Sequence, residues 1–307
     1  MENMFSNCMN LNSLNLETFD TSIVMTMNKM FQNGSFISLD LFNFNTSNVN
    51  IMSSMFEDSK KLKSLNISSF DTSKINAMNN MFDHCSSLTS LDISNFDTSN
   101  VNSMASMFYY CSSLTSLNVS NFNTSNVNSM ASMFNGCSTL TSLNVSNFDT
   151  SKLSSLNSMF YNRKKLSSLD LSNFITDSVN TMSNMFYGCE KLVKLNLLNF
   201  NTSNVINMGS MFQGCRDLKI IDISSFNTSN VTDISDLLCG CLNLTIINLF
   251  NFNTSLVKKM SSMFSGSSSL ISLNIESFNT SSVEYMDEMF SNCKKFKTFN
   301  LSHFNTS

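Results

Sequence analysis

The sequence predicts a repeat solenoid, because one unit of about 26 residues recurs in twelve copies along the whole chain. A Met-Phe pair marks the unit, and its Phe stands at positions 5, 31, 56, 82, 108, 134, 160, 186, 212, 264 and 290, with Leu238 in the one missing place. A second marker, Phe-Asx-Thr-Ser, keeps the same spacing from Phe19 to Phe304, with the variant Phe-Ile-Thr-Asp at Phe174. The chain contains 23 Met and 28 Phe but no Trp and no Pro, a bias typical of a short unit copied many times.

The copy at residues 82–108 indicates what each unit forms. Leu91 and Ile93 alternate with polar residues, which is typical of a short strand. Val101 and Met104 precede the next Met-Phe pair at spacings of three and four, which favours a short extended piece that enters a single helical turn. Polar turns separate the two apolar stretches.

Stacking of the units is expected to bury their apolar sides, since one unit alone cannot do so. Successive coils would pair as short parallel strands about 4.8 Å apart, along a right-handed path. We therefore expect about 12 coils, each with short parallel strands and one short helical turn, in a single uncapped solenoid domain over residues 1–307. Both ends fall within a unit, which favours a fragment of a longer protein; the alternative is ends that pair with other chains.

The charge and hydropathy of the chain exclude several classes of protein. Only 13% of the residues are charged and the net charge is −4, which excludes the basic surface of a nucleic-acid-binding protein. The apolar content of 42% is enough for a sizeable core. Polar residues interrupt every apolar stretch, so neither a membrane-spanning helix nor a signal peptide is predicted in this segment.

The copy at residues 82–108 resembles the BspA-like bacterial surface-protein repeats of the leucine-rich-repeat superfamily. The matching features are the turn FDTSNV, the run MFxxCSSL and the strand LTSLDIS, and they recur along essentially the whole chain. The resemblance implies a leucine-rich-repeat-like solenoid at the cell surface or secreted, with a role in adhesion or host contact. A Phe follows the strand where the superfamily usually has Asn, so a plain β-solenoid is the alternative for the inner coil geometry.

Eight of the nine cysteines occupy one slot, three residues after the Phe of the Met-Phe pair: Cys8, Cys85, Cys111, Cys137, Cys189, Cys215, Cys241 and Cys293. A column of disulfides or a metal site are the alternatives to buried free thiols. Ser59, Arg163 and Ser267 fill the same slot in other copies. A disulfide or metal framework would not permit these replacements, so we expect buried free thiols and no metal or other cofactor.

The methionines and the threonines are also locked to slots of the repeat. Twenty-one of the 23 Met stand either immediately before or four residues before the Phe of the Met-Phe pair, which predicts core packing rather than an adaptable binding surface. The Thr of the Asx-Thr-Ser turn occurs in all twelve copies. We interpret it as a structural turn, with calcium binding as the alternative, because calcium favours several carboxylates and a Gly-rich turn.

A second Asx column on the outward side of the strand is the candidate binding face. Its members proposed for binding are Asp40, Asn66, Asp92, Asn118, Asn144, Asp170, Asn196 and Asp222. Stacked Asn side chains can form amide ladders, and with the neighbouring Ser they form an exposed, flat, weakly charged face. Ice binding is a remote alternative, which would favour regular outward Thr rows.

Lysines follow the Cys slot in some copies, at Lys60 and Lys61, at Lys164 and Lys165 beside Arg163, and at Lys294 and Lys295. We interpret these clusters as a solvated edge, with a weak anion-binding patch as the alternative.

No catalytic set is predicted. The chain has only two histidines, His84 and His303, each in a single copy, and among its seven Gly there is no phosphate-binding motif. We therefore expect a non-catalytic cell-surface protein that mediates adhesion or protein–protein interaction, with proteins or matrix ligands as partners and neither nucleic acid nor membrane insertion. The alternative is a structural spacer or an intracellular scaffold without a binding site of its own.

Overall fold

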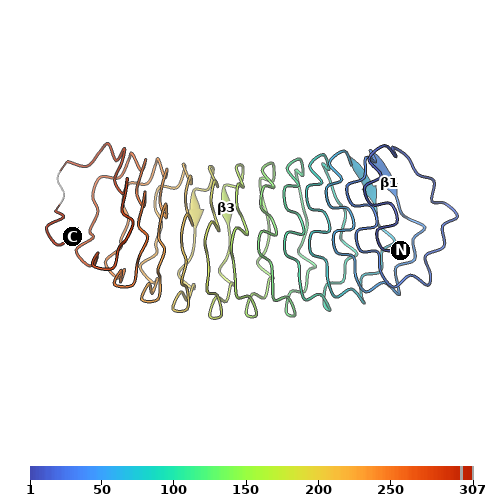
Figure 1. The fold of residues 1–307 in the computed structure, drawn as a ribbon, viewed down its shortest axis with the longest axis horizontal. Helices are drawn as coiled ribbons and strands as arrows, with labels where there is room; N and C mark the ends of the chain where they lie inside the picture. Colours follow the sequence, from blue (N-terminus) through green and yellow to red (C-terminus); the bar gives the residue numbers. More distant parts are fainter. Residues whose placement is uncertain (298–299, 306–307) are drawn as a thin grey trace. The chain divides into compact units, whose positions relative to one another are not determined.

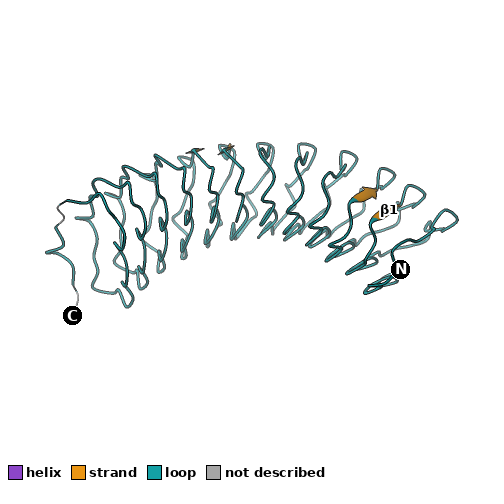
Figure 2. Ribbon diagram, turned by 90° about the horizontal axis from the view of Figure 1, so that it is seen from above, coloured by secondary structure: helices purple, strands orange, loops and turns teal. Residues whose placement is uncertain are grey.

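The computed structural model describes residues 1–297 and 300–305. These residues form two compact units, Met1–Lys152 (unit 1) and Leu153–Ser307 (unit 2). Within each unit, the chain runs through successive coils that lie side by side (Figure 1). Turns and loops form nearly all of each coil (Figure 2).

Two pairs of short parallel strands stack the coils. In unit 1, β1 (Ser38–Asp40) pairs with β2 (Ser64–Asn66), and in unit 2, β3 (Ser168–Leu169) pairs with β4 (Lys194–Leu195). Each residue pairs with its copy one repeat later, as in Leu39 with Leu65. Leu39 is buried between two exposed neighbours, as the predicted alternation requires, but the segment at Leu91 and Ile93, for which the strand was predicted, does not form one.

A second parallel ladder runs through the Met-x-x-Met-Phe segment, where a helical turn was expected. Single bridges join this segment to the next coil, as in Ala77 with Ser103. Alternate amides donate to the following coil: Met78 N to Ser103 O (3.1 Å), Asn80 N to Ala105 O (2.9 Å), Phe82 N to Met107 O (2.9 Å) and His84 N to Tyr109 O (2.7 Å). The residues that the structure describes contain no helix, so the expected helical turn is wrong.

The reason lies in backbone conformation. Asn80 (φ 57°) and His84 (φ 54°) adopt the left-handed region, and the same two positions do so in other copies. A left-handed residue every four positions interrupts a right-handed helix after each turn. Single turns remain, such as the bond from Met81 N to Met78 O (3.2 Å), and the other amides face the next coil. Asn and Gly, which accept this conformation well, recur at these positions.

The core of each unit is a ladder of Phe and Met. In unit 1, the rings of Phe31, Phe56, Phe82, Phe108 and Phe134 stack with centroids 5.6 to 5.8 Å apart and planes within 6°. In unit 2, Phe160, Phe186 and Phe212 stack in the same way. The slot methionines between these rings are fully buried, which confirms that they pack the core. The exposed methionines are Met4, Met9 and Met25.

The Asx-Thr-Ser turn connects each coil to the next. The hydroxyl of Thr46 donates to the carbonyl of Asp71 (2.8 Å) and accepts from its amide (2.8 Å), and Thr72 bonds Asp97 in the same way. These threonines are buried. The structural interpretation of the Thr is therefore confirmed, and its bonds reach the neighbouring coil rather than its own turn.

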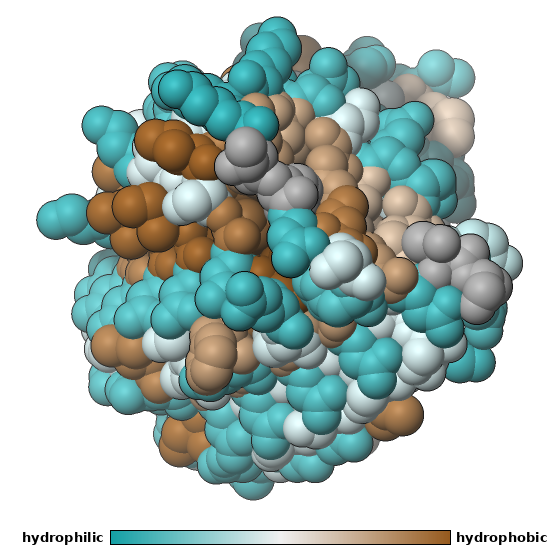
Figure 3. Space-filling model, turned by 90° about the vertical axis from the view of Figure 1, so that its left-hand side faces the viewer, coloured by the Kyte–Doolittle hydropathy of each residue, from teal (hydrophilic) through white to brown (hydrophobic). Residues whose placement is uncertain are grey.

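The left-hand side of Figure 1 is formed by the last coils of unit 2. Seen from that side, apolar residues gather in the middle and hydrophilic residues surround them (Figure 3). Among the residues that the structure describes, no helix has the length and apolar character needed to cross a membrane.

Candidate interaction surface

The outward side chains of the strands form one face of each unit, which we call the strand face. It consists of the Asx column and of the two positions that precede the inward Leu, as in Thr89 and Ser90 before Leu91. Seven members of the proposed column are exposed, and Asn66 is half-buried. The structure thus places the candidate residues at the surface, with five of them in unit 1 and three in unit 2.

Each Asx side chain on this face also has a structural task. Asp92 Oδ1 accepts the amide of Ser94 (3.0 Å), and Asn118 Oδ1 accepts the amide of Ser120 (3.1 Å). Hydrogen bonds from the side chain and amide of Ser94 lower the pKa of Asp92 below its ordinary value, so it is a carboxylate at neutral pH. Except in Asn66, whose Nδ2 bonds Asp40, a second oxygen or the amide group of each side chain is left for solvent or a partner.

Within the Asx column, Asn66 Nδ2 donates to the carboxylate Oδ1 of Asp40 at 2.9 Å, which is a single bond between an amide and a carboxylate and not a ladder of stacked Asn amides. Other asparagines join the coils through hydrogen bonds from the side chain to the backbone. Asn121 Nδ2 donates to the carbonyl of Phe96 (2.9 Å), and Asn126 Nδ2 donates to the carbonyl of Ser99 (2.8 Å), both in the preceding coil. Sequence reasoning missed these asparagines, although their recurrence before Phe and before Val was a visible signal.

The composition of the strand face differs between the units. In unit 1, three copies carry the same Thr-Ser pair, at residues 89–90, 115–116 and 141–142. In unit 2, the same two positions hold Val193 and Lys194, then Lys219 and Ile220. A shallow hollow of about 680 Å³ lies there, lined among others by Leu169, Val193, Lys194, Leu195, Lys219 and Ile220.

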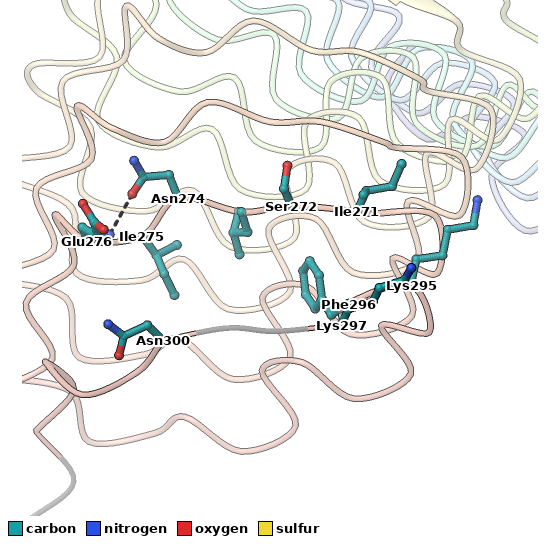
Figure 4. Close-up of a pocket in the computed structure, with 10 residues that line it drawn as sticks. Ile271, Ser272, Asn274, Ile275, Glu276, Lys295, Phe296, Lys297 and Asn300 are labelled. Atoms are coloured by element: carbon teal, nitrogen blue, oxygen red, sulfur yellow. Dashed lines mark hydrogen bonds between the residues drawn. The ribbon is translucent and has the colours of Figure 1, made fainter.

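A second hollow of about 700 Å³ continues the strand face of unit 2. Figure 4 shows Ile271 and Ser272 on one coil and Phe296 with Lys295 and Lys297 on the next. The amide of Glu276 donates to Asn274 Oδ1 (3.1 Å), which repeats the Asx turn of the other copies. The strand face therefore offers wide, open hollows rather than an enclosed pocket.

The cysteine slot lies inside the coils and not on this face. All nine cysteines are free, and six of them are buried: Cys85, Cys111, Cys137, Cys189, Cys215 and Cys241. Each of the six donates its Sγ hydrogen to the carbonyl of the Phe that opens the preceding unit, 3.0 to 3.2 Å away. Burial raises the pKa of Cys189 to about 12. The prediction of buried free thiols is confirmed, and a thiol held in this way is a poor nucleophile.

The charged side chains form a network of surface pairs at the edge that follows the Cys slot. Lys60 pairs with Asp58 (2.9 Å), and Lys191 pairs with Asp217 (3.0 Å). Most of these side chains are well exposed, in agreement with a solvated edge. Arg163 is the exception, since it is fully buried in the Cys slot instead of joining the exposed lysines.

The two histidines lie in different environments. His84 Nδ1 lies 2.5 Å from Asp83 Oδ1, and the His84 ring stacks on Tyr110 with centroids 5.1 Å apart. His303 Nε2 lies 3.0 Å from the carbonyl oxygen of Ile275. Neither contact joins a histidine to a serine or cysteine nucleophile. Within residues 1–297 and 300–305, no group of three or more His, Cys, Asp or Glu side chains is placed to hold a metal ion.

Stacked parallel coils with an inward Leu and an exposed Asx column define a leucine-rich-type repeat solenoid. The family model described as "Mycoplasma protein of unknown function, DUF285" matches residues 1–115, 86–168, 155–246 and 239–307, so the chain belongs to this family. The tandem matches of this family model along residues 1–307 confirm the predicted tandem repeats.

Solved structures similar to this chain include bacterial leucine-rich repeat proteins. A leucine-rich cell surface protein from Faecalibacterium prausnitzii is 16% identical, with 91% of this chain and 84% of that chain covered and a TM-score of 0.46. A leucine-rich repeat protein from Eubacterium ventriosum is 16% identical, with 85% of this chain and 72% of that chain covered and a TM-score of 0.44. No curated protein matches the chain.

Proposed function

We propose that this protein is a non-catalytic repeat protein that binds other proteins through the strand face of its solenoid, at the cell surface or after secretion. The observation that carries the proposal is the position of that face. Its side chains are exposed, while the backbone beneath them is held by hydrogen bonds between coils, as at β1 and β2. Adhesion is the role that the resemblance to BspA-like surface proteins supports.

The geometry supports protein partners better than small molecules. The hollows of the strand face are open and shallow, whereas a small-molecule site is a cleft that encloses most of its ligand. The face presents Ser, Thr, Asn and Asp in rows, and these groups can donate or accept hydrogen bonds over a wide area. The proposal also includes three features of the fold, namely a right-handed path of the chain, about twelve coils and a single domain over residues 1–307.

A spacer or scaffold without a binding site is the second candidate. It is favoured by three consecutive copies of unit 1 that carry the same Thr-Ser pair followed by an Asx at the same position. A surface that repeats without variation distinguishes no position for a partner. The two candidates differ in whether changes on the strand face alter any binding.

The repeat itself supplies variants that should fold. Lys194 occupies the position of Ser90, Ser116 and Ser142, so a triple Ser→Lys variant at these three sites adds charge to the strand face of unit 1 with a residue that the fold accepts. Lys74 and Lys152 occupy the position of Asn48, Asn100 and Asn126. A triple Asn→Lys variant at those sites adds the same charge away from the strand face and is the matched control; because each Asn bonds the preceding coil, circular dichroism must first show that this variant is folded.

Binding of the three proteins to cultured animal cells and to immobilised matrix proteins would be measured by flow cytometry and biolayer interferometry. The strand-face variant is expected to bind at least about tenfold more weakly than the control, since three buried lysine charges would cost well over 1.4 kcal/mol. Equal binding by both variants would show that the strand face of unit 1 is not the site. Absence of binding by the parent protein would favour the spacer.

A further inference from the structure

The strand face of unit 2 carries a row of exposed aliphatic side chains that unit 1 lacks. Val193 is 41% exposed, Ile220 71%, Ile246 62% and Ile271 58%. They lie on four successive coils: Val193 and Ile271 stand two positions before the inward residue of their coil, and Ile220 and Ile246 stand one position before it and pair with each other. We call these four residues the aliphatic stripe.

Folding does not require the aliphatic stripe. Three copies of unit 1 hold Thr and Ser at these positions, as at Ser90 and Ser116, and form the same coil, while Ile37 occupies one of the positions in an earlier copy. Scattered exposed hydrophobics are ordinary, but contiguous ones on a protein surface mark an interaction site. Four such residues lie on neighbouring coils, and two of them, Val193 and Ile220, line the hollow of about 680 Å³, so we interpret them as a feature of binding rather than of packing.

The distance between neighbouring coils favours a helical partner over an extended one. Neighbouring coils in a parallel ladder lie about 4.8 Å apart, which is close to the 5.4 Å rise of about one α-helical turn. A helix that lies along the stripe would place one apolar residue over each coil. In an extended segment, side chains on one face are about 6.6 Å apart and would lose register after two coils.

Two lysines beside the stripe indicate the charge of the partner. Lys194 follows Val193 directly, and Lys219 precedes Ile220. Both lysines are exposed, and neither forms an ion pair within the described residues. By contrast, Lys191 in the same unit is paired with Asp217. The free ammonium groups are complementary to carboxylates that flank the apolar side of a helix.

We propose that the aliphatic stripe binds an amphipathic α-helix of a partner protein, with aliphatic residues at i, i+4, i+7 and i+11 and with carboxylates beside them that reach Lys194 and Lys219. This inference rests on the proposed function and specifies its partner. The contact follows the helix-in-groove mode, in which apolar anchors supply affinity and flanking charges supply orientation.

The probes are three fluorescein-labelled synthetic peptides. The first is a stapled helix with Leu at i, i+4, i+7 and i+11 and Glu beside them, the second has Lys in place of Glu, and the third alternates Leu and Glu in an unstapled, extended chain. Fluorescence polarisation with the full chain is expected to show that the first peptide binds at least about tenfold more tightly than the other two, because the second repels the lysines and the third loses register.

The variants replace stripe residues with those of other copies. Ile220→Ser with Ile246→Ser is expected to weaken binding of the first peptide at least about tenfold, and Lys194→Ser with Lys219→Thr is expected to weaken it several-fold and to reduce its salt dependence. The control is Leu256→Asn, which removes an equally exposed aliphatic residue outside the stripe and restores the Asn of neighbouring copies. Its binding should equal that of the parent.

The proposal is overturned if the parent does not bind the first peptide, if the Ile220→Ser/Ile246→Ser variant binds it equally well, or if the extended peptide binds more tightly. Self-association of the parent in analytical ultracentrifugation that is lost in that variant would assign the stripe to a second copy of this chain and overturn the proposal as well. A failure here leaves the proposed function intact as long as the triple Ser→Lys variant of unit 1 still loses binding to cells or matrix proteins.

Discussion

Cys111 and Phe82 are joined across two coils by a hydrogen bond from Sγ to the backbone carbonyl, 3.0 Å long. The same bond recurs along the slot, and two serines form it where cysteine is absent: Ser59 Oγ to the carbonyl of Phe31 (3.0 Å) and Ser267 Oγ to the carbonyl of Leu238 (2.7 Å). In these copies, unlike the copy with Arg163, the slot thus holds a small side chain with a hydrogen-bond donor, and it does not require the chemistry of sulfur.

This relationship predicts the effect of substitutions in the slot. Cys111→Ser keeps the donor and should change the free energy of unfolding by less than about 1 kcal/mol. Cys111→Ala leaves the carbonyl of Phe82 buried without that donor and adds a small cavity, so a loss of about 2 kcal/mol is expected. Urea unfolding followed by circular dichroism measures both. An alanine variant as stable as the serine variant would contradict the donor argument.

The turn threonines form hydrogen bonds between coils, and replacing one of them should lower stability. Thr124 Oγ1 donates to the carbonyl of Asp149 (3.0 Å) and accepts its amide (2.7 Å). Thr124→Val keeps the shape but leaves both backbone groups of Asp149 unsatisfied, so we expect a loss of about 2 to 4 kcal/mol in unfolding free energy. Thr89→Val is the control, because Thr89 is exposed and its hydroxyl has no such task. The argument fails if the two variants unfold at the same urea concentration.

Much of the fold could be predicted from the repeat. The inward positions of Leu39 and Ile93, the buried methionines and the buried thiols all follow from period and hydropathy, because stacked copies must bury the same slots. The Met-x-x-Met-Phe segment could not be predicted in this way. Its apolar spacing of three and four fits a helical turn, and the left-handed conformation of Asn80 and His84 shows only in the backbone.

The candidate surface was predicted in part. The Asx column was placed correctly at the surface. The hydrogen bond that Asp92 Oδ1 accepts from the amide of Ser94 depends on loop geometry, which the aligned sequence copies do not reveal. The aliphatic stripe was not found, because reasoning from the repeat looks for what the copies share. Ile220 and Ile246 are departures from the shared pattern, and their exposure distinguishes them from core residues.

Burial of the slot predicts the order of thiol reactivity. Burial raises the pKa of Cys241 to about 12, and burial together with the carboxylate of Asp236 raises the pKa of the half-buried Cys239 to about 11. At mildly alkaline pH the six buried thiols should therefore react with Ellman's reagent only as fast as the coils open, after the half-buried Cys8. All nine should react at once in guanidinium chloride. Rapid reaction of all nine in the folded protein would contradict the buried column.

The Asp83 carboxyl predicts a dependence of stability on pH. Burial raises its pKa from 3.8 to about 6, although His84 lowers it, and the nearby Glu57 and Asp58 raise it further. A group with a raised pKa in the folded state contributes stability that is fully present below its unfolded pKa and is lost as the pH rises through the folded value. The contribution of Asp83 should therefore decline between about pH 4 and pH 6.

Asp83→Asn removes this decline. A shift of this size corresponds to about 3 kcal/mol, and solvent screening of the partly exposed His84–Asp83 pair reduces the expected gain at neutral pH to about 1 kcal/mol. Urea unfolding of both proteins between about pH 4 and pH 7 should show equal stability at the acidic end and a more stable variant at the neutral end. Asp92→Asn, whose exposed carboxylate has a lowered pKa, should show no such gain. A constant difference between Asp83→Asn and the parent over the whole range would mean that the Asp83 carboxyl does not titrate in this window.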